Sequence, residues 1–201
     1  MRIALSIVLF ATAATSGAQE IRPGVPDGWS AFPGTGGLPG RCEIGVDPEM
    51  RTAGTNNTTI QCGNAVPSYA GIYQTFDAPD YRGKRVRYSA LMRTEGVVSS
   101  DEFEAFATLW MRVEGINFQQ PLMVATLGDR ALKGTMGWTP VDIVADLPPN
   151  TVRINIGFRM QPHGQMWVID LKFEEAPAGT PVNAFPVDPQ LLTTPRNLRF
   201  E

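Results

Sequence analysis

Apolar and polar side chains alternate with a period of two along several segments, and this period is what most constrains the fold. Residues 152–159 show it most clearly, with apolar side chains at Ile154, Ile156 and Phe158 and polar or small ones between them. Residues 84–93 repeat the pattern. Successive side chains of a β-strand point to opposite faces of its sheet, so this period is typical of strands buried on one face. Further strands are predicted at residues 72–76, 106–113, 141–146 and 166–174.

Turn-forming residues separate these segments. The 201 residues include 20 glycines and 17 prolines, about 18% of the chain against a usual value of roughly 12%. Strands spaced by roughly ten residues with Gly/Pro turns between them predict an all-β sandwich, which we place in one domain at residues 19–175. The one candidate helix is residues 101–107, which follow a serine cap but run into a strand pattern.

The first 18 residues have the three parts of a secretory signal peptide. Arg2 supplies the positive charge, residues 4–14 form an apolar stretch too short to span a bilayer, and residues 16–18 are small, as a cleavage site requires. We therefore expect a mature chain that begins at Gln19 and is periplasmic or secreted by a bacterium. No later segment of the sequence predicts a transmembrane helix.

The two cysteines of the chain, Cys42 and Cys62, are predicted to form a disulfide. Exported proteins fold in an oxidising compartment, and the segment between these cysteines has many turn residues and little apolar content. The rival role, a reactive thiol or metal ligand, needs a partner, yet the single histidine, His163, lies 101 residues beyond Cys62. We expect His163 to be a solvated loop residue.

The alternation also assigns the faces of the strands. One face of each strand in a sandwich enters the core. The apolar set in the last strong strand, expected to be core, is Trp167, Ile169, Leu171 and Phe173. In residues 106–113 the apolar odd-numbered positions take the core side, which leaves Trp110 and Arg112 outward. By the same rule Arg159 faces outward.

Trp110, Arg112 and Arg159 are therefore the candidate ligand-binding residues. An exposed indole can stack on the apolar face of a pyranose, while guanidinium groups donate hydrogen bonds to its hydroxyls or grip the carboxylate of a uronic acid. The alternative is that Trp110 packs beneath a covering segment such as residues 176–195. The ligand face would then lie at the loop ends near Trp29 and Trp138.

Five motifs form a recognisable set. They are YAGIYQTFDAPDYRGKRVRYSALMRTE (residues 69–95), LWMRVEG (109–115), KGTMGW (133–138), WVIDLKFE (167–174) and PRNLRFE (195–201). Together they resemble a bacterial exported jelly-roll domain of the galactose-binding-like and carbohydrate-binding-module type, over most of residues 28–174 and the C-terminal motif. The resemblance implies an accessory, non-catalytic domain. Domains of this kind are often labelled regulators and have no DNA-binding element of their own.

Domains of the resembled type often hold a structural calcium ion, partly through acidic residues in these motifs. Ile169 stands where the family has one aspartate, and Gly137 stands where it has another. These replacements argue against the calcium site and leave Asp170 as the remaining candidate ligand. No other cofactor is expected.

Charge and motifs argue against several other functions. The chain has 17 basic and 20 acidic residues and a pI near 5.3, whereas a nucleic-acid-binding domain usually presents a basic stripe. The sequence contains no nucleophile elbow, metalloprotease or phosphate-loop motif. Our first hypothesis is a non-catalytic exported binding module for carbohydrate or another cell-envelope ligand. A structural or protein-interaction subunit of the envelope is the alternative, and a glycan-active enzyme ranks third.

The last segment, residues 176–201, is predicted to be an extended tail. It contains five prolines between residues 176 and 195 and little periodicity. Leu198 and Phe200 alternate near its end, which predicts an edge strand at residues 197–200 that covers part of the sandwich.

Overall fold

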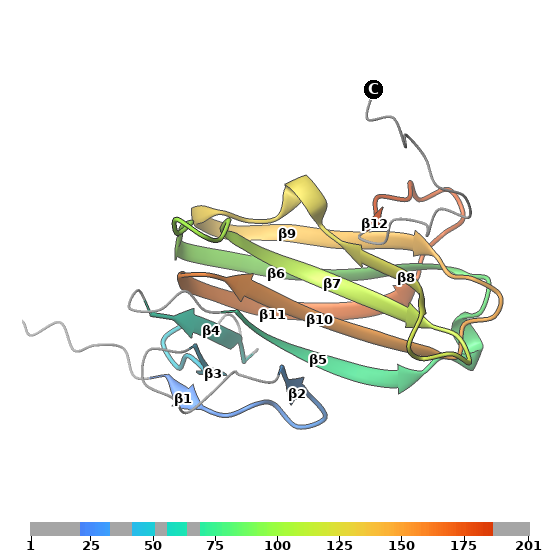
Figure 1. Cartoon of the computed structure of the whole chain (residues 1–201), viewed down its shortest axis with the longest axis horizontal. Coiled ribbons are helices and arrows are strands. Elements are labelled where there is room, and N and C mark those ends of the chain that lie inside the picture. Colours follow the sequence, from blue (N-terminus) through green and yellow to red (C-terminus); the bar gives the residue numbers. More distant parts are fainter. Residues whose placement is uncertain (1–20, 33–41, 51–55, 64–68, 187–201) are drawn as a thin grey trace, which may run out of the picture.

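The computed structural model describes residues 21–32, 42–50, 56–63 and 69–186, and within them the chain is an all-β sandwich (Figure 1). These residues contain no α-helix. The strands are β1 (Arg22–Pro23), β2 (Ser30–Ala31), β3 (Glu43–Val46), β4 (Thr58–Cys62), β5 (Ala70–Asp77), β6 (Arg85–Val97), β7 (Phe106–Glu114), β8 (Pro121–Thr126), β9 (Gly134–Asp146), β10 (Arg153–Gln161), β11 (Gly164–Glu175) and β12 (Phe185–Pro186). The two short 3₁₀ helices are η1 (Pro79–Tyr81) and η2 (Gly128–Arg130).

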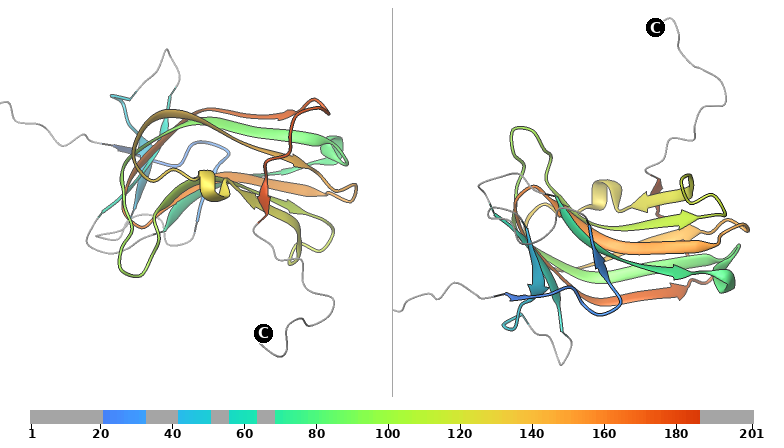
Figure 2. Two further views of the ribbon diagram at one scale, coloured as in Figure 1. Left: turned by 90° about the horizontal axis from the view of Figure 1, so that it is seen from above. Right: turned by 60° about the horizontal axis from the view of Figure 1, so that its bottom comes forward.

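The strands form two six-stranded antiparallel sheets. One has the order β1-β3-β4-β11-β6-β9 and the other the order β12-β8-β7-β10-β5-β2. Figure 2 shows the sheets as two stacked layers, with β1, β3 and β4 gathered at one end of the molecule. The predicted all-β sandwich is therefore confirmed.

The core lies between the sheets and is built by the alternating positions that the sequence indicated. Tyr88 and Met92 of β6 are fully buried, as are Leu109 of β7 and Ile154 and Phe158 of β10. All five belong to one hydrophobic cluster. The core faces predicted for these three strands are confirmed.

Strand β11 departs from the prediction because it contains a β-bulge. Its register against β6 shifts between Ile169 and Lys172. Within the shift, Asp170 has a φ of 52°, a conformation that residues other than glycine seldom adopt. An extra residue in a strand reverses the phase of all that follows.

Trp167 and Ile169 of the predicted core set are buried but lie outside the central cluster, so the face predicted for β11 holds only after the bulge. Before the bulge the core positions are Met166 and Val168, whereas Leu171 and Phe173 pack against the core after it. Trp167 is opposite Arg93 of β6 on the outer face, and its indole Nε1–H donates to the Asp47 carboxylate at 2.8 Å.

The candidate helix at residues 101–107 is also wrong. Residues 98–105 form a loop, which is fastened by hydrogen bonds from Phe103 N–H to Ser100 Oγ at 3.1 Å and from Ala105 N–H to Ser99 Oγ at 2.9 Å. Strand β7 then begins at Phe106. The serines therefore organise a loop and do not cap a helix.

The predicted disulfide between Cys42 and Cys62 is confirmed. It joins the residue before β3 to the last residue of β4, and these two strands pair directly. Both cysteines are buried. The bond therefore ties β3 and β4 to each other, and β4 joins the rest of the sheet by pairing with β11.

Residues 176–186, which we call the strap, cross from one sheet to the other. Arg85 holds the start of the strap by donating to the carbonyl oxygens of Ala178 and Thr180, both at 2.7 Å. Asn183 then bonds the main chain of β9, the edge of the first sheet. Strand β12 pairs with β8 in the second sheet. The strap thus links the open edges of the two sheets (Figure 1).

Two sequence predictions lie outside the described residues. One is the signal peptide at residues 1–18, and the other is the edge strand at residues 197–200 with Leu198 and Phe200.

Removing the disulfide with the double substitution Cys42→Ala and Cys62→Ala should lower the free energy of unfolding. The bond closes a loop with a sequence separation of 20, for which chain entropy predicts about 3 kcal/mol. Urea denaturation of the oxidised parent and of the double variant measures the difference. Equal transition midpoints would show that the bond contributes nothing to stability.

Candidate functional site

The three predicted ligand-binding residues lie on one face of the second sheet, which we call the outer face. Strands β7 and β10 pair directly, and Trp110 is opposite Gly157. Arg159 is opposite Thr108, which lies four residues from Arg112 along β7. Four residues of a strand span about 14 Å. Arg112 and Arg159 are therefore on the same face but do not converge on one ligand.

Trp110 faces outward as predicted, and of the two alternatives for its environment the covered one holds and the exposed platform is wrong. Only 9% of the residue is exposed. The rings of Phe32 and Tyr73 lie 5.5 Å and 6.2 Å from its own. Phe32 follows β2, so the described cover over Trp110 includes an N-terminal segment and not the proline-rich tail.

Two glycines in the strands let these rings lie against the sheet. A Cβ atom at Gly157 would stand 2.7 Å from Trp110 Nε1 and 2.3 Å from the carbonyl oxygen of Ile72. A Cβ atom at Gly71 would stand 2.3 Å from the Phe32 ring. Glycine within a strand often marks such a close approach, and this signal was present in the sequence.

Arg112 is occupied by contacts within its own hairpin. Its Nε donates to Glu114 Oε1 at 2.7 Å, and NH2 donates to the carbonyl oxygen of Phe118 at 2.9 Å. Glu114 is buried, so Arg112 neutralises a carboxylate that would otherwise be costly to bury. These two hydrogen bonds of Arg112 thus stabilise the connection between β7 and β8.

Arg159 has a different environment. Its guanidinium lies 5.5 Å from the ring centre of Tyr69 and 5.4 Å from that of Phe106, and NH1 donates to the Tyr69 hydroxyl at 2.6 Å. Its Nε is buried and has no hydrogen-bond partner. Among the described residues no carboxylate forms an ion pair with it.

Arg159 also lines a cavity of about 170 Å³, which we call the Arg159 pocket. Residues from the start of β7, the end of β8 and the connections around them form the rest of its wall. They include Glu104, Phe106, Thr108, Thr126, Asp129 and Lys133.

Charges of both signs surround this pocket. The ammonium group of Lys133 donates a hydrogen bond to Glu104 and lowers the pKa of that carboxyl below its usual value. Gln161 Nε2 donates to the main-chain carbonyl of Glu104 at 3.0 Å and so fixes the loop. With Arg159 and Asp129 the pocket has two cationic and two anionic groups. It can therefore both donate and accept hydrogen bonds.

The two remaining tryptophan candidates have separate positions. Trp29 packs against the core, with its ring 5.9 Å from that of Phe158. Trp138 is half-buried within β9. Neither lines the Arg159 pocket.

The structure also describes the surroundings of His163 and of the candidate calcium ligand Asp170. His163 is buried, and its Nδ1 is 2.9 Å from the carbonyl oxygen of Gly63, so the expected solvated role is wrong. Asp170 is exposed in the bulge of β11. The described residues contain no cluster of three or more His, Cys, Asp or Glu side chains that could hold a metal ion.

Sequence reasoning missed most of the pocket. Phe106 and Thr108 share the alternation of Trp110 along β7, so they could have been proposed with it. Tyr69, Glu104 and Lys133 lie in connections between strands, and only the fold brings them to Arg159.

None of the helices among the described residues has the length and apolar character needed to cross a membrane.

Comparison with known proteins finds a relative in sequence. It is a protein of Bacillus subtilis strain 168 named uncharacterized HTH-type transcriptional regulator YbfP, which is 32% identical over 172 residues. The match covers 83% of this chain and 55% of the relative, so the chain spans about half the length of the curated relative it matches. No protein-family model matches the sequence.

Two solved structures are similar in fold. The enzymatically active domain of tailspike protein 4 from bacteriophage CBA120 matches with a TM-score of 0.52 and 12% identity, over 75% of this chain and 20% of that one. The CBM22-1 and GH10 modules of Clostridium thermocellum endo-1,4-β-D-xylanase 10B, solved with xylohexaose, match with a TM-score of 0.50 and 15% identity, over 74% of this chain and 26% of that one. The predicted resemblance to carbohydrate-binding modules is thus confirmed for the fold.

The substitution Trp110→Ala should lower the free energy of unfolding by about 3–5 kcal/mol, the usual loss for a packed aromatic ring. The exposed Phe103, at 45%, provides the control, because Phe103→Ala should change stability by less than about 1 kcal/mol. Urea denaturation of both variants measures this. Trp110→Ala with parental stability would contradict the packing role.

Proposed function

We propose that this protein is a non-catalytic carbohydrate-binding domain whose ligand occupies the Arg159 pocket. The observation that carries the proposal is the state of Arg159: its guanidinium lies within 5.5 Å of the ring centres of Tyr69 and Phe106, its side chain lines an open cavity, and no carboxylate of the described residues forms an ion pair with it. A sugar hydroxyl in the cavity would accept a hydrogen bond from this guanidinium.

The other groups of the pocket also suit a sugar. A pyranose has hydroxyls that both donate and accept, and it has apolar C–H faces that pack on aromatic rings. Lys133 and Arg159 can donate, Glu104 and Asp129 can accept, and Phe106 offers a ring. A few polar groups around an apolar element are typical of small-ligand sites.

The charges favour a neutral sugar over a uronic acid. The hypothesis of an acidic ligand relied on Arg112 and Arg159 acting together, but Arg112 is paired with Glu114. The two cations of the Arg159 pocket are balanced by Glu104 and Asp129. An additional carboxylate would therefore find little net positive charge to attract it.

The pocket carboxylates support a binding role over glycoside hydrolysis. A glycosidase needs a carboxylic acid whose raised pKa keeps it protonated until it donates to the leaving group. Lys133 lowers the pKa of Glu104 and so keeps this carboxyl ionised. We propose that Glu104 accepts hydrogen bonds and is not a general acid.

We further propose that the protein is exported. The disulfide between Cys42 and Cys62 is consistent with an oxidising compartment. Mass spectrometry of the protein from its native host should give a chain that begins at Gln19. A native chain that retains residues 1–18 would contradict export by cleavage at this point.

Binding should be tested on an array of neutral and acidic glycans, followed by calorimetry with the ligands found. Xylohexaose belongs in the panel because the similar xylanase modules were solved with it. We expect binding to neutral oligosaccharides, with the substitution Arg159→Gln or Tyr69→Ala weakening it by about 1–3 kcal/mol, as for anchor residues of an interface.

Arg153→Gln is the matched control. Arg153 is an arginine of the same strand and the same face, and it stacks on Phe118 at 4.4 Å, away from the pocket. The Arg153→Gln variant should bind glycans with the same affinity as the parent. Equal losses in both arginine variants would contradict the assignment of the site, and a folded parent that binds no glycan would contradict the function. If the parent bound no glycan but bound an envelope protein at the Arg159 pocket, that result would favour the alternative of a protein-interaction subunit.

A further inference from the structure

The Arg159 pocket shares a wall with the docking site of the strap, and we propose that the strap positions this wall through Arg130. The proposal rests on the proposed function, because it concerns the same pocket. It assigns Arg130 and Asn183 as positioning residues that do not line the pocket themselves.

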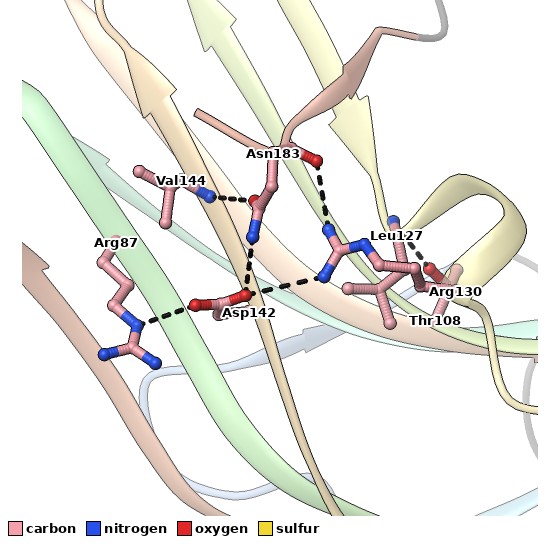
Figure 3. Close-up of polar contacts among 7 residues, drawn as sticks. All are labelled: Arg87, Thr108, Leu127, Arg130, Asp142, Val144 and Asn183. Atoms are coloured by element: carbon pink, nitrogen blue, oxygen red, sulfur yellow. Dashed lines mark hydrogen bonds and ion pairs between the residues drawn. The ribbon is translucent and has the colours of Figure 1, made fainter. Parts of the chain in front are cut away.

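The wall in question is η2. Gly128 and Asp129, two of its three residues, line the pocket together with Thr126, which precedes them at the end of β8. The third residue, Arg130, extends toward Asn183 of the strap and Asp142 of β9 (Figure 3). One short element therefore contacts the pocket on one side and the strap on the other.

Arg130 makes one contact with the strap and one with β9 beside it. Its NH2 donates to the main-chain carbonyl of Asn183 at 3.0 Å, and its NH1 lies 3.5 Å from Asp142 Oδ1. Asn183 Nδ2 donates to the same Asp142 oxygen at 2.7 Å. Figure 3 shows these three side chains meeting at one point.

Asp142 is the centre of this group. Its second carboxylate oxygen accepts from Arg87 Nε at 2.9 Å. Asn183 is in turn fixed on β9, because its Oδ1 accepts from Val144 N–H at 2.7 Å. The strap therefore holds Arg130 against a carboxylate that the first sheet keeps in place.

Other contacts hold the chain on either side of η2. Before it, Leu127 N–H donates to Thr108 Oγ1 at 3.2 Å and Gly128 N–H donates to Thr126 Oγ1 at 3.1 Å. After it, Leu132 exchanges two main-chain hydrogen bonds with Ala107, both at 2.9 Å. Between these anchors, Arg130 is the residue of η2 that bonds the strap. A 3₁₀ segment of three residues has too few internal bonds to hold its own position. Loosening the strap should therefore let η2 move and lower the affinity of the pocket for its ligand.

Hydrogen exchange of the intact chain tests this without any ligand. The reporter is the Ala131 amide, which closes η2 by donating to the carbonyl oxygen of Gly128. Arg130→Ala and Asn183→Ala should each speed its exchange about tenfold, because the opening of this segment becomes easier. Arg130→Lys, which keeps a cation beside Asp142, should restore most of the protection.

Arg87→Ala is the matched control for these variants. Arg87 and Arg130 both pair with Asp142 and are similarly exposed, at 47% and 43%. However, among the described residues Arg87 forms no hydrogen bond or ion pair with η2 itself. Its loss leaves Asp142 in contact with Asn183 and Arg130, so it should speed the exchange of Ala131 much less than the loss of Arg130 does. All variants should melt close to the parent, because exposed pairs contribute little to global stability.

Calorimetry with a neutral oligosaccharide then separates the two proposals. If the parent binds, Arg130→Ala and Asn183→Ala should raise Kd several-fold and Arg87→Ala should not. Parental exchange and affinity in Asn183→Ala would overturn the role of the strap and leave the proposed function standing. Faster exchange of Ala131 in a parent series that binds no sugar would support the coupling and overturn the proposed function.

Discussion

The pairing of β7 with β10 is the constraint on which the rest of the molecule depends. It places Leu109 opposite Phe158 on the core side and Trp110 opposite Gly157 on the outer face. The first pair helps to bury the apolar core between the sheets. The second lets an indole lie across a bare backbone, where Phe32 covers it. The same register sets Arg159 beside Thr108 and Phe106, so the pocket is a consequence of the pairing that builds the core.

The edges of the two sheets complete the pocket. Strand β8 ends at Thr126, and η2 turns the chain toward β9 at the side where the sandwich is open. The strap crosses this opening, bonds β9 through Asn183 and pairs with β8 through β12. Edge strands expose unpaired main-chain groups, so closing them has a structural use that is independent of any ligand. The position of η2 depends on the same contacts.

The sequence was informative wherever one strand face is buried by neighbours of regular spacing. The alternation in β6, β7 and β10 predicted their inward faces because period two is a local property of the chain. It failed in β11, where Asp170 inserts one residue and reverses the phase. It could not foresee that Phe32 covers Trp110, because that contact joins residues 78 positions apart and depends on β2 pairing with β5. Short strands such as β1 and β12 have no period to detect.

The candidate site was also predictable only in part. The sequence predicted which side chains face outward. It did not predict that Arg112 pairs with Glu114 or that Arg159 lies against Tyr69. Glu114 is two residues from Arg112 in sequence, yet its burial follows from the fold. Tyr69 reaches Arg159 across 90 residues. The pocket depends on loops, whose positions the strand pattern leaves open.

We propose that Arg159, and not Trp110, contacts the ligand. Nuclear magnetic resonance of the Arg159 Nε–H and the Trp110 indole N–H during titration with neutral oligosaccharides, beginning with xylohexaose, tests it most directly. We predict that the Arg159 resonance shifts as ligand is added, while the Trp110 resonance stays near its starting position. A saturating titration that shifts the indole and leaves Arg159 unmoved would contradict the account.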